Sequence, residues 1–214
     1  MNYNDYKRAR DLAWLVLIRM GVTQLPVVVS SICKAYGFML YSYEQGRDII
    51  SMMKLQNRTY KTDGFTTYHM GKYFIFYNGS LSNSRLRFTI AHELGHILLD
   101  HVPRKQGEAT AINREPSPND NPQEQQANVF ASRLLAPACV LHGLGISSAQ
   151  EISEYCKISN RCAAYRAERI ELLNNREQKF LKQRGTSNYG MSNLERQVMN
   201  RFTGYIERNR VSVS

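Results

Sequence analysis

The sequence predicts an α+β fold, with a core of helices and a small antiparallel sheet followed by a helix-turn-helix-like helical module. Three patterns support this prediction. Apolar residues recur at helical spacing over residues 83–99 and 122–135. Three β-like runs occupy residues 38–43, 66–70 and 73–77. Residues 146–166 have the pattern of a helix, a short turn and a second helix.

The composition is that of an ordinary globular chain. Of 214 residues, 43% are apolar and 21% are charged, a balance far from that of disordered chains. A chain of this length can bury a core without a metal or a disulfide, so we expect any metal site to be functional. The net charge of +10 permits binding to nucleic acid or another acidic partner without establishing it.

Nothing in the sequence predicts secretion or a membrane partner, so we expect a cytoplasmic protein. The four cysteines form no C-x-x-C pair, which is typical of buried, reduced thiols. The apolar run at residues 12–18 is bracketed by Asp11 and Arg19 and precedes no cleavage site. It is too short for a transmembrane helix, as is every other apolar stretch.

The first half of the chain contains two predicted helices and then three strands. Residues 6–20 suit a helix that ends near Gly21, and residues 27–36 suit a second helix that begins after Pro26. A strand follows at residues 38–43. The runs at residues 66–70 and 73–77 predict a hairpin with a two-residue turn at Gly71 and Lys72.

Two further helices flank a long polar loop. Residues 83–99 form the first, with Asn83 or Ser84 as its N-cap. Residues 102–122 hold four of the six prolines and predict a loop, and long loops in compact domains are often functional. The second helix begins at Pro122 and continues to about residue 136.

The chemistry is concentrated in residues 92–96, which read H-E-L-G-H, an H-E-x-x-H motif. Residues four apart on a helix share a face, so His92 and His96 direct their imidazoles to one point. Two neutral imidazoles at this spacing bind Zn²⁺ well. Glu93 is offset by about 100°, which puts it in the position of a general base and not of a ligand.

A catalytic zinc needs a third protein ligand and an open position. The other histidines (69, 101 and 142) and the downstream carboxylates are candidates, and Glu124 is the best of them. It lies on a helical face with Ala127, Asn128 and Ala131, whose small alanines allow close packing on the histidine helix. Glu124 also fits the third position of a capping box that begins at Asn121. Asn128 could hold a ligand imidazole by its other nitrogen, or it could make an ordinary polar contact between helices.

Residues 87–101 (R-F-T-I-A-H-E-L-G-H-I-L-L-D-H), with the later pattern E-x-x-A-N-x-F-A-x-x-L-L-A-P over residues 124–137, resemble the ImmA/IrrE family of zinc metallopeptidases. The resemblance covers roughly residues 10–175. It implies a zincin-like, gluzincin-type core with one Zn²⁺ on His92, His96 and Glu124, and Glu93 as catalytic base. It also implies an endopeptidase that cleaves a repressor-type regulator, often one linked to a prophage or mobile element.

An oxyanion formed during peptide hydrolysis usually needs a second electrophile. Tyr68, His69, Tyr73 and His101 are all candidates for this role. The sequence offers no reason to prefer one of them.

The helix-turn-helix-like segment leaves a second function open. Its shared core is predicted to contain Ile152, Cys156, Ile158, Cys162 and Tyr165. Asn160, Arg161, Arg166 and Arg169 are predicted on or near an outward surface of the second helix, where they could contact DNA. We favour a module that packs on the peptidase or grips a protein substrate, since such geometry alone reads no sequence. The alternative function is a non-catalytic, zinc-containing protein that binds DNA or a regulator.

The predicted domains are a zinc metallopeptidase core at residues 1–137, the helix-turn-helix-like module at residues 138–184, and a linker with a C-terminal amphipathic helix at residues 185–214. The final helix carries an apolar stripe, which more often docks on a core or a protein partner than binds lipid. Its members are Leu194, Val198, Phe202 and Ile206. The sequence does not predict an oligomeric state.

Overall fold

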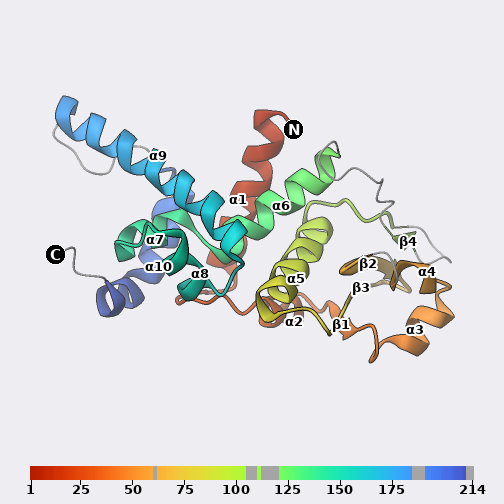
Figure 1. The fold of residues 1–214 in the computed structure, drawn as a ribbon. Helices are drawn as coiled ribbons and strands as arrows, with labels where there is room; N and C mark the ends of the chain where they lie inside the picture. Colours follow the sequence, from red (N-terminus) through yellow and green to blue (C-terminus); the bar gives the residue numbers. More distant parts are fainter. Residues whose placement is uncertain (60–61, 105–109, 112–120, 185–190, 211–214) are drawn as a thin grey trace. The chain divides into compact units, whose positions relative to one another are not determined.

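A computed structural model describes residues 1–59, 62–104, 110–111, 121–184 and 191–210 of the chain (Figure 1). The chain divides into two compact units. One contains Met1–Leu12 and Val28–Ala131, and the other contains Ala13–Val27 and Ser132–Ser214. The predicted functional division at residues 137 and 184 stays a prediction, and the predicted linker at residues 185–190 lies outside the described residues.

The first unit is built on a four-stranded sheet with the strand order β1-β3-β2-β4. Its strands are β1 (Met39–Ser42), β2 (Gly64–His69), β3 (Lys72–Tyr77) and β4 (Thr110–Ala111). β2 pairs antiparallel with β3 and β4, but β1 pairs parallel with β3. The expectation of a purely antiparallel sheet is therefore wrong.

The parallel pair follows from the connection between its strands. Parallel neighbours need a crossover of a dozen or more residues, and the chain from β1 to β3 passes through α3 (Arg47–Met52), α4 (Gln56–Thr59) and β2. Neither short helix was predicted from the sequence. β4 lies within the predicted polar loop, whose residues 105–109 and 112–120 are outside the described parts of the chain.

The turn between β2 and β3 is displaced by one residue from its predicted place. It consists of Met70 and Gly71, with φ angles of 46° and 81°, whereas Gly71 and Lys72 were expected. Two successive positive φ angles are those of the type I′ turn that suits a twisted hairpin. The resulting register pairs Tyr68 with Tyr73.

Helices lie on both faces of this sheet (Figure 1). α5 (Asn83–Leu98) packs on β2 and β3, and α2 (Val29–Ala35) packs on α5 and β1. On the other face, Ile50 and Met53 form an apolar cluster with Phe65 and Phe76. Successive residues of β2 therefore face opposite sides of the sheet. Phe65 enters this cluster, whereas Gly64 lies against α5.

Two helices, α6 (Pro122–Leu135) and α1 (Tyr3–Arg19), have residues in both units. α6 begins at the predicted residue. The expectation that every apolar stretch is too short for a membrane span is wrong, because within the described ranges the stretch Pro122–Leu144 is long and apolar enough to cross a membrane, although 72% of its most apolar window is buried. Core helices of soluble proteins share these properties, so the stretch is weak evidence for a membrane span.

The second unit contains the predicted helix, turn and helix as α8 (Ala149–Cys156) and α9 (Asn160–Arg184). Ser148 caps α8 through a capping box with Glu151. The buried core of the motif includes Ile152, Cys156 and Ile158, as expected.

The predicted rotation of the second helix is wrong. Tyr165, expected in the core, is 61% exposed, whereas Arg166, expected at the surface, is only 2% exposed. Arg166 Nε donates a 2.9 Å hydrogen bond to the carbonyl of Ala136. Ala163 and Ile170 are buried on the same face of α9 as Arg166. A guanidinium with a buried acceptor can occupy such a position in place of an apolar side chain.

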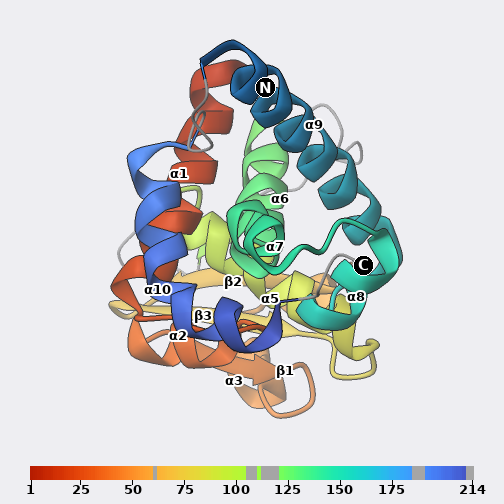
Figure 2. The ribbon, with the colours of Figure 1, turned by 90° about the vertical axis from the view of Figure 1, so that its left-hand side faces the viewer.

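The final helix, α10 (Asn193–Asn209), packs on α7 (Ala138–Leu144) within the second unit (Figure 2). A Cβ atom at Gly143 would lie 2.9 Å from Ile206 Cδ1. Val198 and Phe202 are fully buried. The apolar stripe of this helix therefore docks on a protein core, as the sequence predicted.

Candidate metal centre

The two motif histidines lie one turn apart on α5, in its buried half. Ser82 is the N-cap of this helix, one residue before the predicted candidates. His92 is 9% exposed and His96 is fully buried. Their Nε2 atoms are 2.9 Å apart, so both imidazoles face one point as their spacing predicts.

Glu124 brings a carboxylate to this point from α6. Its Oε2 lies 3.1 Å from His92 Nε2, and its Oε1 lies 3.3 Å from His96 Nε2. Asn121 caps α6, accepting a hydrogen bond from the backbone of Gln123. The two carboxylate oxygens thus divide between the two histidines, which favours the ligand role for Glu124 over its capping-box role.

Close packing of α5 and α6 makes this meeting of side chains possible. Ala127 and Ala131 are fully buried on α6, as predicted for small residues on its inner face. At Gly95, between the two histidines, a Cβ atom would lie 2.9 Å from Phe130 Cδ1. Any larger residue at Gly95 would push the two helices apart.

The electrostatics of the cluster favour the protonation states that bind a metal. Burial lowers the pKa of the His96 imidazole below its ordinary value, so His96 is neutral at pH 7. Burial would raise the pKa of Glu124, but its close contacts with the imidazoles of His92 and His96 outweigh burial and lower that pKa well below its usual range. Glu124 is therefore a carboxylate.

The donor set fits a zinc ion. Donor atoms from His92, His96 and Glu124 all lie within 4.8 Å of one another in a buried group. Tetrahedral zinc with bonds of about 2.0–2.1 Å would place neighbouring ligand atoms roughly 3.3 Å apart, close to the observed 2.9–3.3 Å. Two imidazoles and one carboxylate also match a catalytic zinc site, which keeps a fourth position open.

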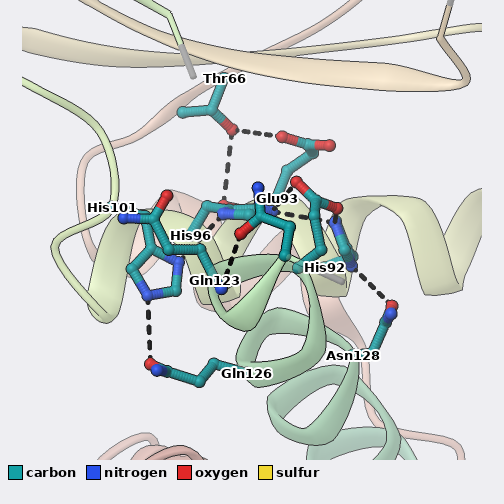
Figure 3. Close-up of polar contacts among 10 residues, drawn as sticks. Thr66, His92, Glu93, His96, His101, Gln123, Gln126 and Asn128 are labelled. Atoms are coloured by element: carbon teal, nitrogen blue, oxygen red, sulfur yellow. Dashed lines mark hydrogen bonds and ion pairs between the residues drawn. The ribbon is translucent and has the colours of Figure 1, made fainter. Parts of the chain in front are cut away.

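Glu93 is held by the sheet above α5 (Figure 3). Thr66 on β2 donates a 2.8 Å hydrogen bond from Oγ1 to Glu93 Oε2, and Glu93 is fully buried. None of its oxygens belongs to the three-residue group that could hold a metal. This placement agrees with a base beside the ligands, as its offset on the helix predicted. Thr66 was not singled out in the sequence, where alternation within β2 was its only signal.

Asn128 contacts the outer nitrogen of His92. His92 Nδ1 lies 2.9 Å from Asn128 Oδ1, one turn along α6 from Glu124. An amide oxygen only accepts hydrogen bonds, so this contact favours the tautomer in which His92 Nδ1 carries the proton and Nε2 is left for a metal. This is the supporting contact that the sequence suggested for Asn128.

His101 contacts the outer nitrogen of His96, although it lies beyond the end of α5. The two Nδ1 atoms are 3.1 Å apart, and His101 Nε2 lies 3.2 Å from Gln126 Oε1 (Figure 3). Burial lowers the pKa of His101 to about 4. Gln126 was not identified from the sequence, and no motif marked it.

The strand register and the hydrogen-bond partners distinguish the candidates for the second electrophile. Gly64 and Thr66 face α5, so Tyr68 has the register of that face and His69 has that of the opposite one. Tyr73 pairs with Tyr68, but its hydroxyl accepts a 2.6 Å hydrogen bond from Arg104 Nε. His101 is engaged with His96. Tyr68 is the remaining candidate on the face of the site.

Comparison with known proteins agrees with this geometry. The family model described as IrrE N-terminal-like domain (Peptidase_M78) matches residues 48–168, more than half of the chain. The matched segment contains His92, Glu93, His96 and Glu124. No protein in a curated collection matches the chain.

Proposed function

Because the chain belongs to the IrrE N-terminal-like family of metallopeptidases, we propose that it is a zinc-dependent endopeptidase of the gluzincin type that cleaves a repressor-type regulator protein. One observation carries the proposal. The buried group of His92, His96 and Glu124 has the donor atoms and spacing of a catalytic zinc site, and Glu93 follows the first ligand on the same helix.

In this function His92 Nε2, His96 Nε2 and one oxygen of Glu124 hold the ion. Bound zinc supplies Lewis-acid chemistry, which acidifies a water at the open position and polarises the scissile carbonyl. The three ligands come from two helices that are packed closely at Gly95. Their positions are therefore set by the packed core of the first unit and not by a loop.

Glu93 moves the protons of the reaction. Thr66 donates to its Oε2 and so orients the carboxylate, and we assign this carboxylate as the group that takes the proton from the attacking water. Glu93 then returns this proton to the nitrogen of the leaving amine. The Thr66 hydroxyl keeps the carboxylate in one orientation through both transfers.

Tyr68 is the residue that we assign to the oxyanion. Its place two residues after Thr66 on β2 puts it on the sheet face that covers α5. A phenolic O–H donates to a developing negative charge. The neighbouring Tyr73, whose ring centroid is 4.9 Å from that of Tyr68, packs against the ring of Tyr68.

The resemblance to the ImmA/IrrE family supports the substrate class, a regulator encoded near the peptidase, as on a prophage or mobile element. A cytoplasmic location would follow from such a substrate. DNA binding by the α8–α9 module is not part of the proposal. Arg166, one of the side chains expected on its DNA-contacting surface, is buried against Ala136 instead.

The proposal is tested by searching for new N-termini in cells that produce the wild-type protein or Glu93→Gln. This variant keeps the volume of the side chain and removes the base. A cleavage in a regulator that occurs with the wild type and disappears with Glu93→Gln, while both proteins hold one zinc per chain, supports the proposal. A cleavage that persists at the full rate in Glu93→Gln contradicts it.

A further inference from the structure

A chain of contacts leads from the cluster of possible ligands to α6. His96 Nδ1 faces His101 Nδ1 at 3.1 Å, and His101 Nε2 faces Gln126 Oε1 at 3.2 Å (Figure 3). All three side chains are buried, with at most 9% exposed. Water therefore does not readily replace these contacts, and their donors and acceptors must match one another.

The order of protons along this chain follows from its last member. An amide oxygen cannot donate, so the hydrogen bond to Gln126 requires the proton of His101 to be on Nε2. A neutral imidazole carries one N–H, which leaves His101 Nδ1 as an acceptor. The proton between the two rings then belongs to His96 Nδ1. His96 Nε2 is left with a lone pair that points at His92 and Glu124.

We propose that His101 and Gln126 are positioning residues, which fix the tautomer of His96 so that its Nε2 atom is available to the metal. This inference rests on the proposed zinc site. His92 reaches the same state by a shorter route, since its Nδ1 donates directly to Asn128. Both ligand imidazoles are thus set by amides of α6, the helix that also supplies Glu124.

The consequence is a cluster that favours a cation. In the metal-free protein the Glu124 carboxylate, 3.1–3.3 Å from both Nε2 atoms, competes for the imidazole protons, and the contacts of Nδ1 with Asn128 and His101 hold those protons on the outer nitrogens. His92 Nε2, His96 Nε2 and Glu124 then present lone pairs to one point, and a positive charge among them relieves their mutual repulsion. The opposite orientation of the Gln126 amide would reverse the order of donors and acceptors along these contacts. It would put a proton on His96 Nε2 and remove a ligand.

The backbone holds His101 in place for this role. α5 ends in a Schellman turn, in which Asp100 has a φ of 63° and the amide of His101 donates to the carbonyl of His96 at 2.9 Å. The Leu99 carbonyl accepts a 3.1 Å hydrogen bond from Arg8 Nη2. The turn folds the chain back along the helix and returns His101 to His96, five residues earlier.

The test uses zinc as the ligand and needs no peptide substrate. Nitrogen-15 NMR of the metal-free protein reports which nitrogen of His96 carries the proton, and a competition titration measures the zinc Kd. His101→Leu and Gln126→Leu remove the contacts from His96 through His101 to Gln126, which we call the relay. His101→Asn keeps it, because the amide oxygen occupies the place of Nδ1. His142→Leu is the matched control, as His142 Nδ1 contacts Asn174 Oδ1 at 2.8 Å in the second unit.

We expect His96 to be protonated on Nδ1 in the wild type and to lose this preference in both leucine variants at residues 101 and 126. Their zinc Kd should rise about 10- to 100-fold, while that of His101→Asn stays within about threefold and that of His142→Leu does not change. An Nε2-protonated His96 in the metal-free wild type overturns the inference, even if a leucine variant fails to fold. So does an unchanged zinc Kd in folded Gln126→Leu.

Failure of the proposed function has a different signature. A protein that binds zinc through an Nδ1-protonated His96 but cleaves no regulator would disprove the substrate class and leave the relay intact. A protein that cleaves its regulator normally while His96 is protonated on Nε2 would disprove the relay alone.

Discussion

Thr66 Oγ1 lies 2.8 Å from Glu93 Oε2 and 3.4 Å from the backbone oxygen of the same residue. This contact joins β2 to α5. Two residues earlier, a Cβ atom at Gly64 would lie 2.6 Å from Thr89 Cγ2. The sheet is therefore held against the helix that carries the H-E-x-x-H motif, and the carboxylate assigned as base has a fixed orientation.

Thr66→Val is expected to impair catalysis without removing the metal. Valine keeps the volume of the side chain but removes the donor to a buried carboxylate, a loss of about 1.5–3 kcal/mol. Part of this loss should appear as a lower free energy of unfolding and part as a kcat reduced roughly tenfold. Thr66→Ser retains the hydroxyl and should be nearly wild type. Equal activity of the valine and serine variants would disprove the role.

Removal of the Glu124 carboxylate is expected to abolish stable metal binding. The wild type should contain one zinc per chain by elemental analysis, and Glu124→Ala should lose most of it because two imidazoles alone form an incomplete site. Glu168→Ala, at an exposed position on α9, is the control and should retain zinc. Full zinc content in Glu124→Ala would return Glu124 to its capping-box role.

Gly95→Ala is expected to separate α5 from α6. The new methyl group would meet Phe130 at 2.9 Å, and such overpacking typically costs about 1–3 kcal/mol. Denaturant unfolding should show this loss, and zinc affinity should fall with it. Phe130→Leu in the same chain should recover part of both, because the smaller side chain relieves the clash. Strict additivity of the two substitutions would show that these residues do not interact.

The free energy of unfolding is expected to fall in alkali, because two buried thiols ionise more readily in the unfolded chain. Burial raises the pKa of Cys33 and Cys139 from 9.0 to about 12. Each thiol ionises more readily after unfolding, so its contribution is complete below pH 9 and is lost as the pH rises from 9 towards 12. The slope is about 1.4 kcal/mol per pH unit and thiol.

Denaturant unfolding between pH 9 and 10.5 measures this slope. Cys33→Ala and Cys139→Ala should each show a shallower fall in the free energy of unfolding than the wild type. Identical slopes in all three proteins would contradict the burial of these thiols. At pH 7.5 neither thiol of the folded wild type should react with a disulfide reagent, because the thiolate is the reactive form.

Local pattern was sufficient for most of the candidate site. The i, i+4 spacing of His92 and His96 depends only on helix geometry, and Glu124 and Asn128 follow from one face of the next helix. The resemblance of the two motifs to a known family then supplied the metal and the chemistry. The match of the family model to residues 48–168 confirms that family.

Sequence patterns did not predict the contacts between elements that are distant along the chain. Arg166 was placed at the surface because arginine is rarely buried, yet the carbonyl of Ala136, thirty residues earlier, accepts its hydrogen bond. The parallel pairing of β1 with β3 was missed for a similar reason. Strand propensity does not say which neighbour a strand will meet or in which direction.

By itself the sequence determined the helix that presents the H-E-x-x-H motif, the α+β class and the candidate ligands, because these depend on short spacings and side-chain chemistry. Only the tertiary structure decided what surrounds the ligands. Thr66 is brought to Glu93 by the register of the sheet, and Gln126 is brought to His101 by the packing of two helices and a left-handed turn at Asp100. Such contacts form between segments whose separation along the chain carries no periodic signal, so they appear only once the chain is folded.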